Sequence, residues 1–222
     1  MLVSMKQLYT IEDVKKALAL PDFDAAAAQQ MMAPLPRINK RVRPSHMPGR
    51  AREGCVLLLL YCHQGELHIV LTRRRDDLNS HAGQISFPGG RREPGEPCQA
   101  AALRETHEEV GVPPTAVTIL GQLGDLYIPP SDFEVRPFVG WYLPEGRPVF
   151  CPAECEVAEI LEAPVSALLD DSVRKVGTRE WNGMSFPVPY FDVEGHMVWG
   201  ATAIMLSEFL ERLKAVGDKV RG

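Results

Sequence analysis

The chain has 222 residues, of which 45% are hydrophobic, 24% charged and 7% aromatic, a composition typical of one globular domain with an extension. Its 24 basic and 29 acidic residues give a formal net charge of −5, which argues against non-specific nucleic-acid binding. No apolar run approaches the ~20 residues of a membrane span and no signal-like block opens the chain, so we expect a cytoplasmic protein with no membrane partner.

The first 49 residues are expected to form a helical and extended arm. Residues 10–34 are predicted to be helical, because Thr10 can cap the segment IEDVKKALAL and the alanine-rich stretch after it has high helix propensity. Residues 34–54 are basic and rich in proline and glycine, which predicts an extended lead-in. The lead-in contains three basic residues, Lys40, Arg41 and Arg43, which either contact an anionic ligand or form a solvated basic loop. Composition alone favours the solvated loop.

A single domain is expected over residues 50–216, followed by a tail over 217–222. Two strands at 55–62 and 66–74 are separated by a hairpin turn, and a short strand lies within the Gly/Pro-rich segment 81–96. A helix over about 97–110 follows. Further strands are predicted within 117–129, 134–143, 148–150, 155–170 and 183–200, and an amphipathic helix within 201–217. This order predicts an α+β domain with a mixed β-sheet between helices.

The five cysteines are expected to be reduced. Their number is odd and no CxxC pair is present, which argues against a disulfide framework or a zinc ribbon. We therefore predict partly buried thiols at all five positions: Cys55, Cys62, Cys98, Cys151 and Cys155.

The helix near the middle of the chain carries a dense group of acids. Pro97 suits the first helical position and Gly111 suits a left-handed residue after the last turn. At ~100° per residue, Glu105, Glu108 and Glu109 share one face of this helix. That face is either a solvated acidic surface or a metal site.

The residues of the helix leave these two interpretations equally open. Three carboxylates this close repel one another, and Arg104 is the only strong base in the segment. Hard divalent cations are the natural complement of such oxygen ligands. The opposite face, with Leu103 and Val110, is the one expected to be buried, while Ala101 and Ala102 lie at the edges of the acidic face.

The surrounding residues resemble a known motif. Residues 90–112, GRREPGEPCQAAALRETHEEVGV, resemble the Nudix box, GX5EX7REUXEEXGU. Every position with a specified identity matches, and Thr106 stands where the pattern asks for a bulky aliphatic residue. The resemblance implies a Nudix-like α/β/α sandwich, here with an N-terminal helical extension, which hydrolyses a nucleoside diphosphate derivative with Mg2+ or Mn2+.

The resemblance also implies roles for the residues of the box. Arg104 would orient the carboxylates, and Glu105 or Glu108 would be the general base. Glu96 would support the loop or reach the metal through water. The implied metal ligands are the carboxylates of the box and one backbone carbonyl: Glu105, Glu109, Glu108, Glu96 and Gly89.

The segment before the box resembles a particular branch of this superfamily. Residues 70–90, VLTRRRDDLNSHAGQISFPGG, resemble the coenzyme A pyrophosphatase signature, LLTxR[SA]x3Rx3Gx3FPGG. Arg75 replaces a small residue of the signature, and Asn79 replaces an arginine. The implied substrate-binding residues are Arg74, Arg73, Gly83, Phe87, Gly90 and Asn79. His81 also lies inside this signature.

This branch implies cleavage of coenzyme A or acyl-coenzyme A to 3′,5′-ADP and 4′-phosphopantetheine, by a protein that we expect to be a homodimer. Because Asn79 departs from the signature, another substrate stays open, such as ADP-ribose, a dinucleoside polyphosphate or a nucleoside triphosphate. A non-catalytic nucleotide-sensing module is a third possibility, although such modules tend to lose box acids. Glu156 and Glu159 are either further site carboxylates or surface acids, and Trp199 is expected to be a core residue.

Overall fold

The computed structural model describes residues 8–34, 43–44, 47, 49, 51–78, 82–181 and 183–221. The N-terminal arm contains two helices, α1 (Ile11–Leu18) and α2 (Ala25–Gln30). Thr10 caps α1 in a reciprocal capping box with Asp13, as the sequence predicted, and Asp24 caps α2. The continuous helical region expected over residues 10–34 is interrupted near Asp22, whose φ of 55° breaks the helix.

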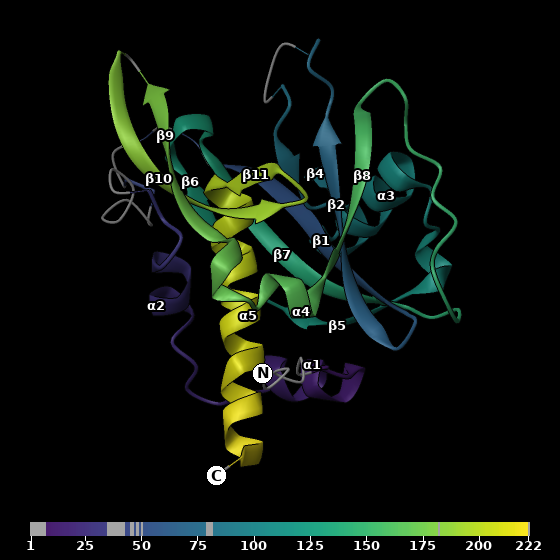
Figure 1. Ribbon diagram of the computed structural model, residues 1–222. Coiled ribbons are helices and arrows are strands. Elements are labelled where there is room, and N and C mark those ends of the chain that lie inside the picture. The colour runs from purple at the N-terminus through teal and green to yellow at the C-terminus, as the bar shows by residue number, and fades with distance from the viewer. Residues whose placement is uncertain are drawn as a thin grey trace.

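The main sheet is mixed and has eight strands within the described residues (Figure 1). Its central strand β1 pairs antiparallel with β2 and β4 and parallel with β7, and β3 and β8 pair with β2. Strands β5 and β6 pair with β7. The strands are β1 (Arg52–His63), β2 (Glu66–Arg74), β3 (Ile85–Ser86), β4 (Gly89–Arg91), β5 (Val117–Gln122), β6 (Leu126–Ile128), β7 (Phe133–Tyr142) and β8 (Val157–Pro164).

A smaller antiparallel sheet follows in the order β11-β10-β9. Its strands are β9 (Arg174–Trp181), β10 (Met184–Val193) and β11 (His196–Trp199). The remaining helical elements are α3 (Cys98–Val110), η2 (Pro114–Ala116), η3 (Pro129–Ser131), α4 (Val165–Leu168), η4 (Asp171–Val173) and α5 (Gly200–Arg221). In the part of the chain that the structure describes, no helix has the length and apolar character needed to cross a membrane.

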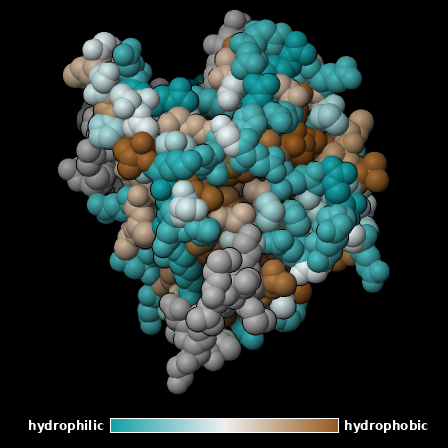
Figure 2. All heavy atoms as spheres, viewed as in Figure 1, coloured by the Kyte–Doolittle hydropathy of each residue, from teal (hydrophilic) through white to brown (hydrophobic). Residues whose placement is uncertain are grey.

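Alternation along β1 creates two hydrophobic cores. Leu57 and Leu59 pack in one core with α3, whereas Leu58 and Leu60 pack in a second core with α5. The sheet therefore lies between α3 and α5, which cover opposite faces (Figure 1). This arrangement confirms the predicted α+β class and the α/β/α sandwich. Hydrophilic residues cover most of the molecular face seen in Figure 2, with hydrophobic residues scattered among them.

The N-terminal helices are attached to α5 through a buried carboxylate. Glu208 of α5 is fully buried and accepts hydrogen bonds from the Gly124 backbone N–H at 3.0 Å and from Gln29 Nε2 of α2 at 2.8 Å. Arg212 Nε donates to the same carboxylate at 3.0 Å. The arm therefore shares a polar network with the main domain. Helix α5 itself continues to Arg221, through most of the segment expected as a tail.

Two strand predictions differ from the structure. Residues 148–150 form no strand, because Phe150 packs against the α3 core instead of joining a ladder. Residues 174–181 form β9, which was not predicted. The strand is hard to recognise in the sequence because it contains several charged residues: Arg174, Lys175, Arg179 and Glu180. These residues form a strand because they pair in register with β10.

The prediction of five reduced cysteines is wrong for one pair. Cys55 of β1 and Cys98 at the start of α3 form a disulfide with a Cα–Cα distance of 5.6 Å. Their separation of 43 residues made this pairing invisible in the sequence, because only the packing of α3 on β1 brings them together. Cys62 is a half-buried thiol, and Cys151 and Cys155 are exposed thiols.

Candidate active site

Helix α3 begins and ends close to the predicted residues. Pro97 is the N-cap, and Gly111 adopts the left-handed conformation with φ 79° while its N–H donates to the His107 carbonyl. A Cβ at Gly111 would lie 2.7 Å from the Cβ of Cys151, so glycine is also required by close packing. The predicted helix over 97–110 is confirmed to within one residue.

Val110 of α3 is buried as expected, but the buried face of the helix extends toward the acids instead of including all of Leu103. Glu109 is only 9% exposed, and Ala101 and Ala102 are fully buried, whereas Leu103 is half-buried. Half of the acidic face thus points toward the sheet. The small side chains of the two alanines let the helix approach β1 closely enough for this orientation.

Two glycines of β4 make room for the acids. The Gly89 N–H donates to Glu109 Oε2 at 3.3 Å, and Gly89 has a φ of 148° that L side chains rarely adopt. A Cβ on Gly90 would lie 2.4 Å from Glu105 Oε2. Glycine is needed at Gly90 because the Glu105 carboxylate occupies the space next to the strand, and at Gly89 because a Cβ would meet the Cys55 carbonyl and Val56 of β1.

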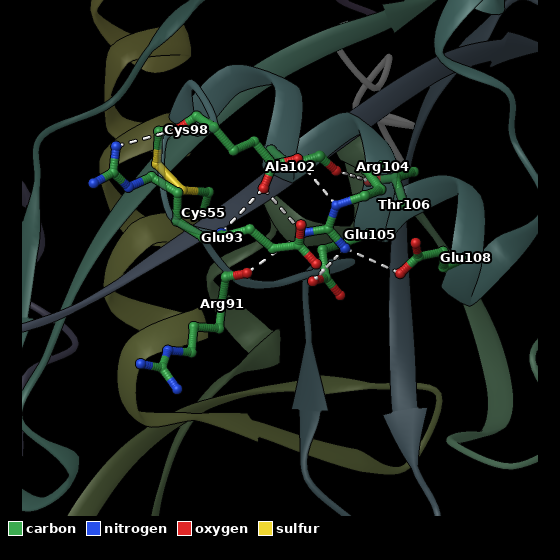
Figure 3. Close-up of polar contacts among 11 residues, drawn as sticks. Cys55, Arg91, Glu93, Cys98, Ala102, Arg104, Glu105, Thr106 and Glu108 are labelled. Carbon is green, nitrogen blue, oxygen red and sulfur yellow. Dashed lines mark hydrogen bonds and ion pairs between the residues drawn. A yellow bond between two sulfur atoms is a disulfide. The ribbon is translucent and has the colours of Figure 1, made fainter.

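Arg104 binds three of the four box acids (Figure 3). Its guanidinium donates to Glu96 at 3.0 and 3.1 Å, to Glu105 at 2.9 Å and to Glu108 at 3.1 Å. The hydrogen bond from Arg104 holds the pKa of Glu96 below its usual range. Arg104 therefore orients these acids, as the sequence suggested, while no contact with Glu109 is found among the described interactions.

Burial disfavours the charged form of the two acids that face the sheet. Burial raises the pKa of Glu109 to about 8, although the Gly89 N–H lowers it, and the nearby charges of Glu105 and Glu156 raise it further. Burial also raises the pKa of Glu105, against the lowering effect of Arg104. Glu105 is paired with Arg104, whereas the hydrogen bond described for Glu109 comes from the Gly89 N–H.

The donor set fits a hard divalent ion. Carboxylate oxygens of Glu109 and Glu105 lie beside the backbone of Gly89 and Gly90, respectively, and oxygen donors are those that Mg2+ prefers. Within the described ranges, however, no three His, Cys, Asp or Glu side chains are already grouped tightly enough to hold a metal ion. The side chains would have to move together around the ion.

The arginines at the end of β2 point to different partners. Arg74 NH1 donates to Glu156 at 3.3 Å, and its charge lowers the pKa of Glu109. Arg73 instead binds Asp76 at 2.9 Å and Glu159 at 3.3 Å. Of the two, only Arg74 is thus shown to act electrostatically on the box acids.

Other predicted substrate residues fall in different environments. Phe87 is 1% exposed in the α5 core, so its predicted contact with substrate is corrected to a packing role. Gly83 forms a turn with φ 65°, beside Asp76, and its N–H donates to the Arg74 carbonyl. The remaining predicted residue, Asn79, lies outside the described residues.

The other basic and aromatic candidates are placed as follows. Three of them lie outside the described residues: His81, Lys40 and Arg41. Arg43 binds Asp132 at 2.8 Å and so anchors the lead-in to the loop before β7. Trp199 is half-buried, with the Arg179 guanidinium 4.8 Å from its ring.

Sequence reasoning offered Glu156 as a possible site carboxylate but did not place residues 151–155 at the site. The N–H groups of Cys151 and Ala153 donate to the carbonyls of Val110 and Glu109, which ties this loop to the end of α3. An open pocket of about 630 Å³ lies at the loop. It is lined by Arg75, Asp76, Asp77, Pro152, Glu154, Val157 and Ala158. The loop has no motif of its own, so only its contacts identify it.

Comparison with known families agrees with this geometry. The NUDIX domain model matches residues 52–178, which include all of the strands and helices around the acids. The chain belongs to the Nudix hydrolase family. Members of this family act on phosphoanhydride bonds and generally use divalent metal ions.

Individual relatives show how far the similarity extends. Nudix hydrolase 15, mitochondrial, from Arabidopsis thaliana is 30% identical over 80% of this chain, although the match spans only 62% of that protein. An uncharacterised Nudix hydrolase, NudL, from Photorhabdus laumondii is 35% identical over 77% of this chain and 90% of its own length. A solved Nudix hydrolase from M. smegmatis, RenU, has a TM-score of 0.52 at 15% identity, covering 82% of this chain and 96% of that one, which supports the fold alone.

The close contact at Gly90 predicts a specific defect of the Nudix box. In Gly90→Ala, the new methyl group displaces the Glu105 carboxylate, because the flexible end of that side chain yields more easily than the backbone. We expect kcat/KM to fall ~10- to 100-fold, about 1.4–2.8 kcal/mol of transition-state stabilisation. Gly95→Ala controls for backbone strain alone, because Gly95 has a φ of 80° and its Cβ would meet nothing within 4 Å. Equal activity of the Gly90 variant and wild type would contradict the contact.

Burial of Glu109 predicts that the metal-free protein loses stability as pH rises. Its pKa is higher in the folded than in the unfolded state, so the folded state binds more protons between about pH 4.5 and 8. The free energy of unfolding should fall by about 2–4 kcal/mol across this range, at ~1.36 kcal/mol per unit of pKa shift. Urea unfolding in EDTA at pH 5 and pH 8 measures this loss.

Comparison with Glu109→Gln isolates the contribution of this carboxyl, because the other titrating groups are common to both proteins. The slope of stability against pH should be smaller in the variant, and Mg2+ should raise the Tm of wild type more than that of the variant at pH 8. Identical slopes in the two proteins would show that Glu109 is not held neutral by burial.

Proposed function

We propose that this Nudix protein is a Mg2+- or Mn2+-dependent pyrophosphohydrolase that cleaves coenzyme A or acyl-coenzyme A to 3′,5′-ADP and (acyl-)4′-phosphopantetheine. The observation that carries the proposal is the position of Arg74. This residue belongs to the segment 70–90, which resembles the coenzyme A pyrophosphatase signature, and it acts electrostatically on Glu109 of the box. A basic group for pyrophosphate and a carboxylate for metal are thus held at one site.

The residues of the site support the proposed reaction as follows. Glu105, Glu109 and the Gly89 carbonyl would hold the ion, with Glu108 and Glu96 as further ligands. A bound divalent ion supplies charge neutralisation of the pyrophosphate and lowers the pKa of an attacking water.

Arg104 keeps Glu105 and Glu108 in fixed orientations through its guanidinium fork. Either acid could take the proton of the water.

A second candidate substrate is another nucleoside diphosphate derivative. The signature arginine is replaced by Asn79, and its nearest substitute in sequence, Arg75, is bound by both oxygens of Asp77 at 2.8 and 2.7 Å and by the Glu154 carbonyl. This engagement leaves Arg75 less able to bind the 3′-phosphate that distinguishes coenzyme A from ADP-ribose. The retained acids Glu96, Glu105, Glu108 and Glu109 argue against a purely nucleotide-sensing module.

A substrate panel tests the proposal. Coenzyme A, acetyl-coenzyme A, ADP-ribose, NADH and diadenosine polyphosphates are incubated with the protein and either Mg2+ or Mn2+, and the products are separated by ion-exchange chromatography. We expect 3′,5′-ADP from the coenzyme A compounds at the highest kcat/KM. A preference for ADP-ribose or a dinucleoside polyphosphate would favour the second candidate, and no turnover with any of them would favour a sensing module. Light scattering tests the homodimer that we propose for the protein.

A further inference from the structure

Three consecutive arginines at the end of β2 serve different purposes. Arg73 and Arg74 end β2 and point to opposite faces, because successive side chains of a strand alternate, whereas Arg75 lies beyond the strand. Leu71 precedes Arg73 on the face of the α5 core, and Val70 lies on the face of the α3 core, which is also that of Arg74. The sequence alone could not assign the phosphate contact among them.

Arg73 and Arg75 are held by carboxylates of their own loop. Arg73 NH1 donates to both oxygens of Asp76 at 3.1 and 2.9 Å, and its Nε donates to Glu159 at 3.3 Å. Arg75 forms a two-point pair with Asp77. The Arg75–Asp77 pair is the stronger, bidentate kind of arginine–carboxylate contact, and Arg73 binds two carboxylates, so each of these arginines makes more hydrogen bonds than the Arg74–Glu156 pair provides.

The contact between Arg74 and Glu156 is of a weaker kind. NH1 of Arg74 lies 3.3 Å from Glu156 Oε2, and the two side chains are 32% and 50% exposed. Ion pairs with this exposure contribute little to stability, so an anionic ligand can displace one partner at small cost.

Backbone contacts fix the position of this pair next to the Nudix acids. The Glu156 carbonyl accepts from the Arg75 N–H at 3.0 Å, and the Glu156 N–H donates to Ala153, whose own N–H donates to the Glu109 carbonyl. Residue 156 is therefore tied both to the end of β2 and to the last turn of α3. Any movement of the Arg74 guanidinium away from Glu156 occurs beside the proposed metal ligands.

We propose that Arg74 exchanges Glu156 for the pyrophosphate of the substrate, so that Glu156 is a positioning residue that holds Arg74 beside the Nudix acids and competes with substrate for it. This inference rests on the proposed pyrophosphohydrolase function. Of the three arginines, Arg74 is the one that contacts the phosphates. Glu156 affects only the free enzyme, because its pair with Arg74 is broken once the substrate has bound.

The test measures binding of methylenebisphosphonate, a pyrophosphate analogue that is not hydrolysed, by calorimetry in the presence of Mg2+. We expect Glu156→Gln to tighten binding about threefold, within the range of an exposed ion pair. In the Arg74→Gln background, the same Glu156→Gln change should have no effect. Tightening that persists without Arg74 would reflect the loss of a general negative charge and would overturn the exchange.

Glu145→Gln is the control, because it removes the same charge from an exposed position of the same connection between β7 and β8, outside the pocket lining. It should leave the affinity unchanged, and tightening equal to that of Glu156→Gln would also overturn the exchange. Kinetics supply a second readout: in Glu156→Gln the KM should fall about threefold while kcat stays constant, as expected for a group that acts on the free enzyme alone. A purely structural role for Glu156 would raise KM or lower kcat.

The two proposals can fail separately. If wild type binds the analogue but the effects of Glu156→Gln and Arg74→Gln on affinity are additive, the exchange is overturned. The pyrophosphohydrolase proposal then still stands. No binding of the analogue with Mg2+ to wild type would overturn both. Arg74→Lys, which keeps the charge, should recover part of the affinity lost in Arg74→Gln if Arg74 contacts the phosphates directly.

Discussion

Glu109→Gln should lower kcat/KM by about 10³-fold or more, equivalent to roughly 4 kcal/mol of transition-state stabilisation. Glutamine keeps the size of the side chain and an oxygen that accepts from the Gly89 N–H, so the packing of α3 on β4 is retained. What is lost is the negative charge that binds the divalent ion next to the pyrophosphate. Glu105→Gln should have an effect of similar size.

The measurement compares initial rates at pH 8 with saturating Mg2+, together with thermal unfolding to confirm that the variants fold. Glu93→Gln is the matched control, because Glu93 lies in the loop of the Nudix box with an exposed side chain. It should retain nearly full activity. Turnover close to wild type in either Glu109→Gln or Glu105→Gln would contradict the metal-binding role proposed for that residue.

Glu208→Ala should destabilise the fold by about 3–5 kcal/mol, the usual cost of removing one partner from a buried charged network. The carboxylate accepts hydrogen bonds from Gly124, Gln29 and Arg212, and its loss leaves these donors without their acceptor in a dry region. The effect should include release of α2, because Gln29 lies on that helix.

Urea unfolding gives the change in stability, and limited proteolysis reports on the arm. We expect cleavage within residues 8–34 of the variant under conditions that leave wild type intact. Glu12→Ala removes an exposed acid that pairs with Lys15 on α1 and should cost no more than ~1 kcal/mol. If Glu208→Ala were as stable as Glu12→Ala, the buried network would not be what holds the arm.

Local features of the fold were predictable because their causes are local. Thr10 caps α1 through residues three positions away, and Gly111 ends α3 through its own backbone conformation. The turn between β1 and β2 depends on Gln64 and Gly65, both with positive φ. The motif over residues 90–112 likewise placed three of the four acids of the Nudix box on one helix.

Partners that are distant in sequence could not be predicted. The pairing of Cys55 with Cys98 and the attachment of Glu208 to Gln29 and Gly124 depend on how helices pack on the sheet. Strand β9 was missed for the same reason, because its charged residues become a strand only in register with β10.

The sequence by itself determined the Nudix family, the box acids and the class of fold, because these follow from spacing along the chain and from periodicity. Only the tertiary structure decided which acids are buried and which arginine lies beside them. Helix geometry places Glu105, Glu108 and Glu109 on one face, but Gly90 leaves the space for Glu105 beside the sheet and the Gly89 N–H binds Glu109 there. The environment of a side chain, and with it the pKa of Glu109, is set by neighbours that only the packed chain brings together.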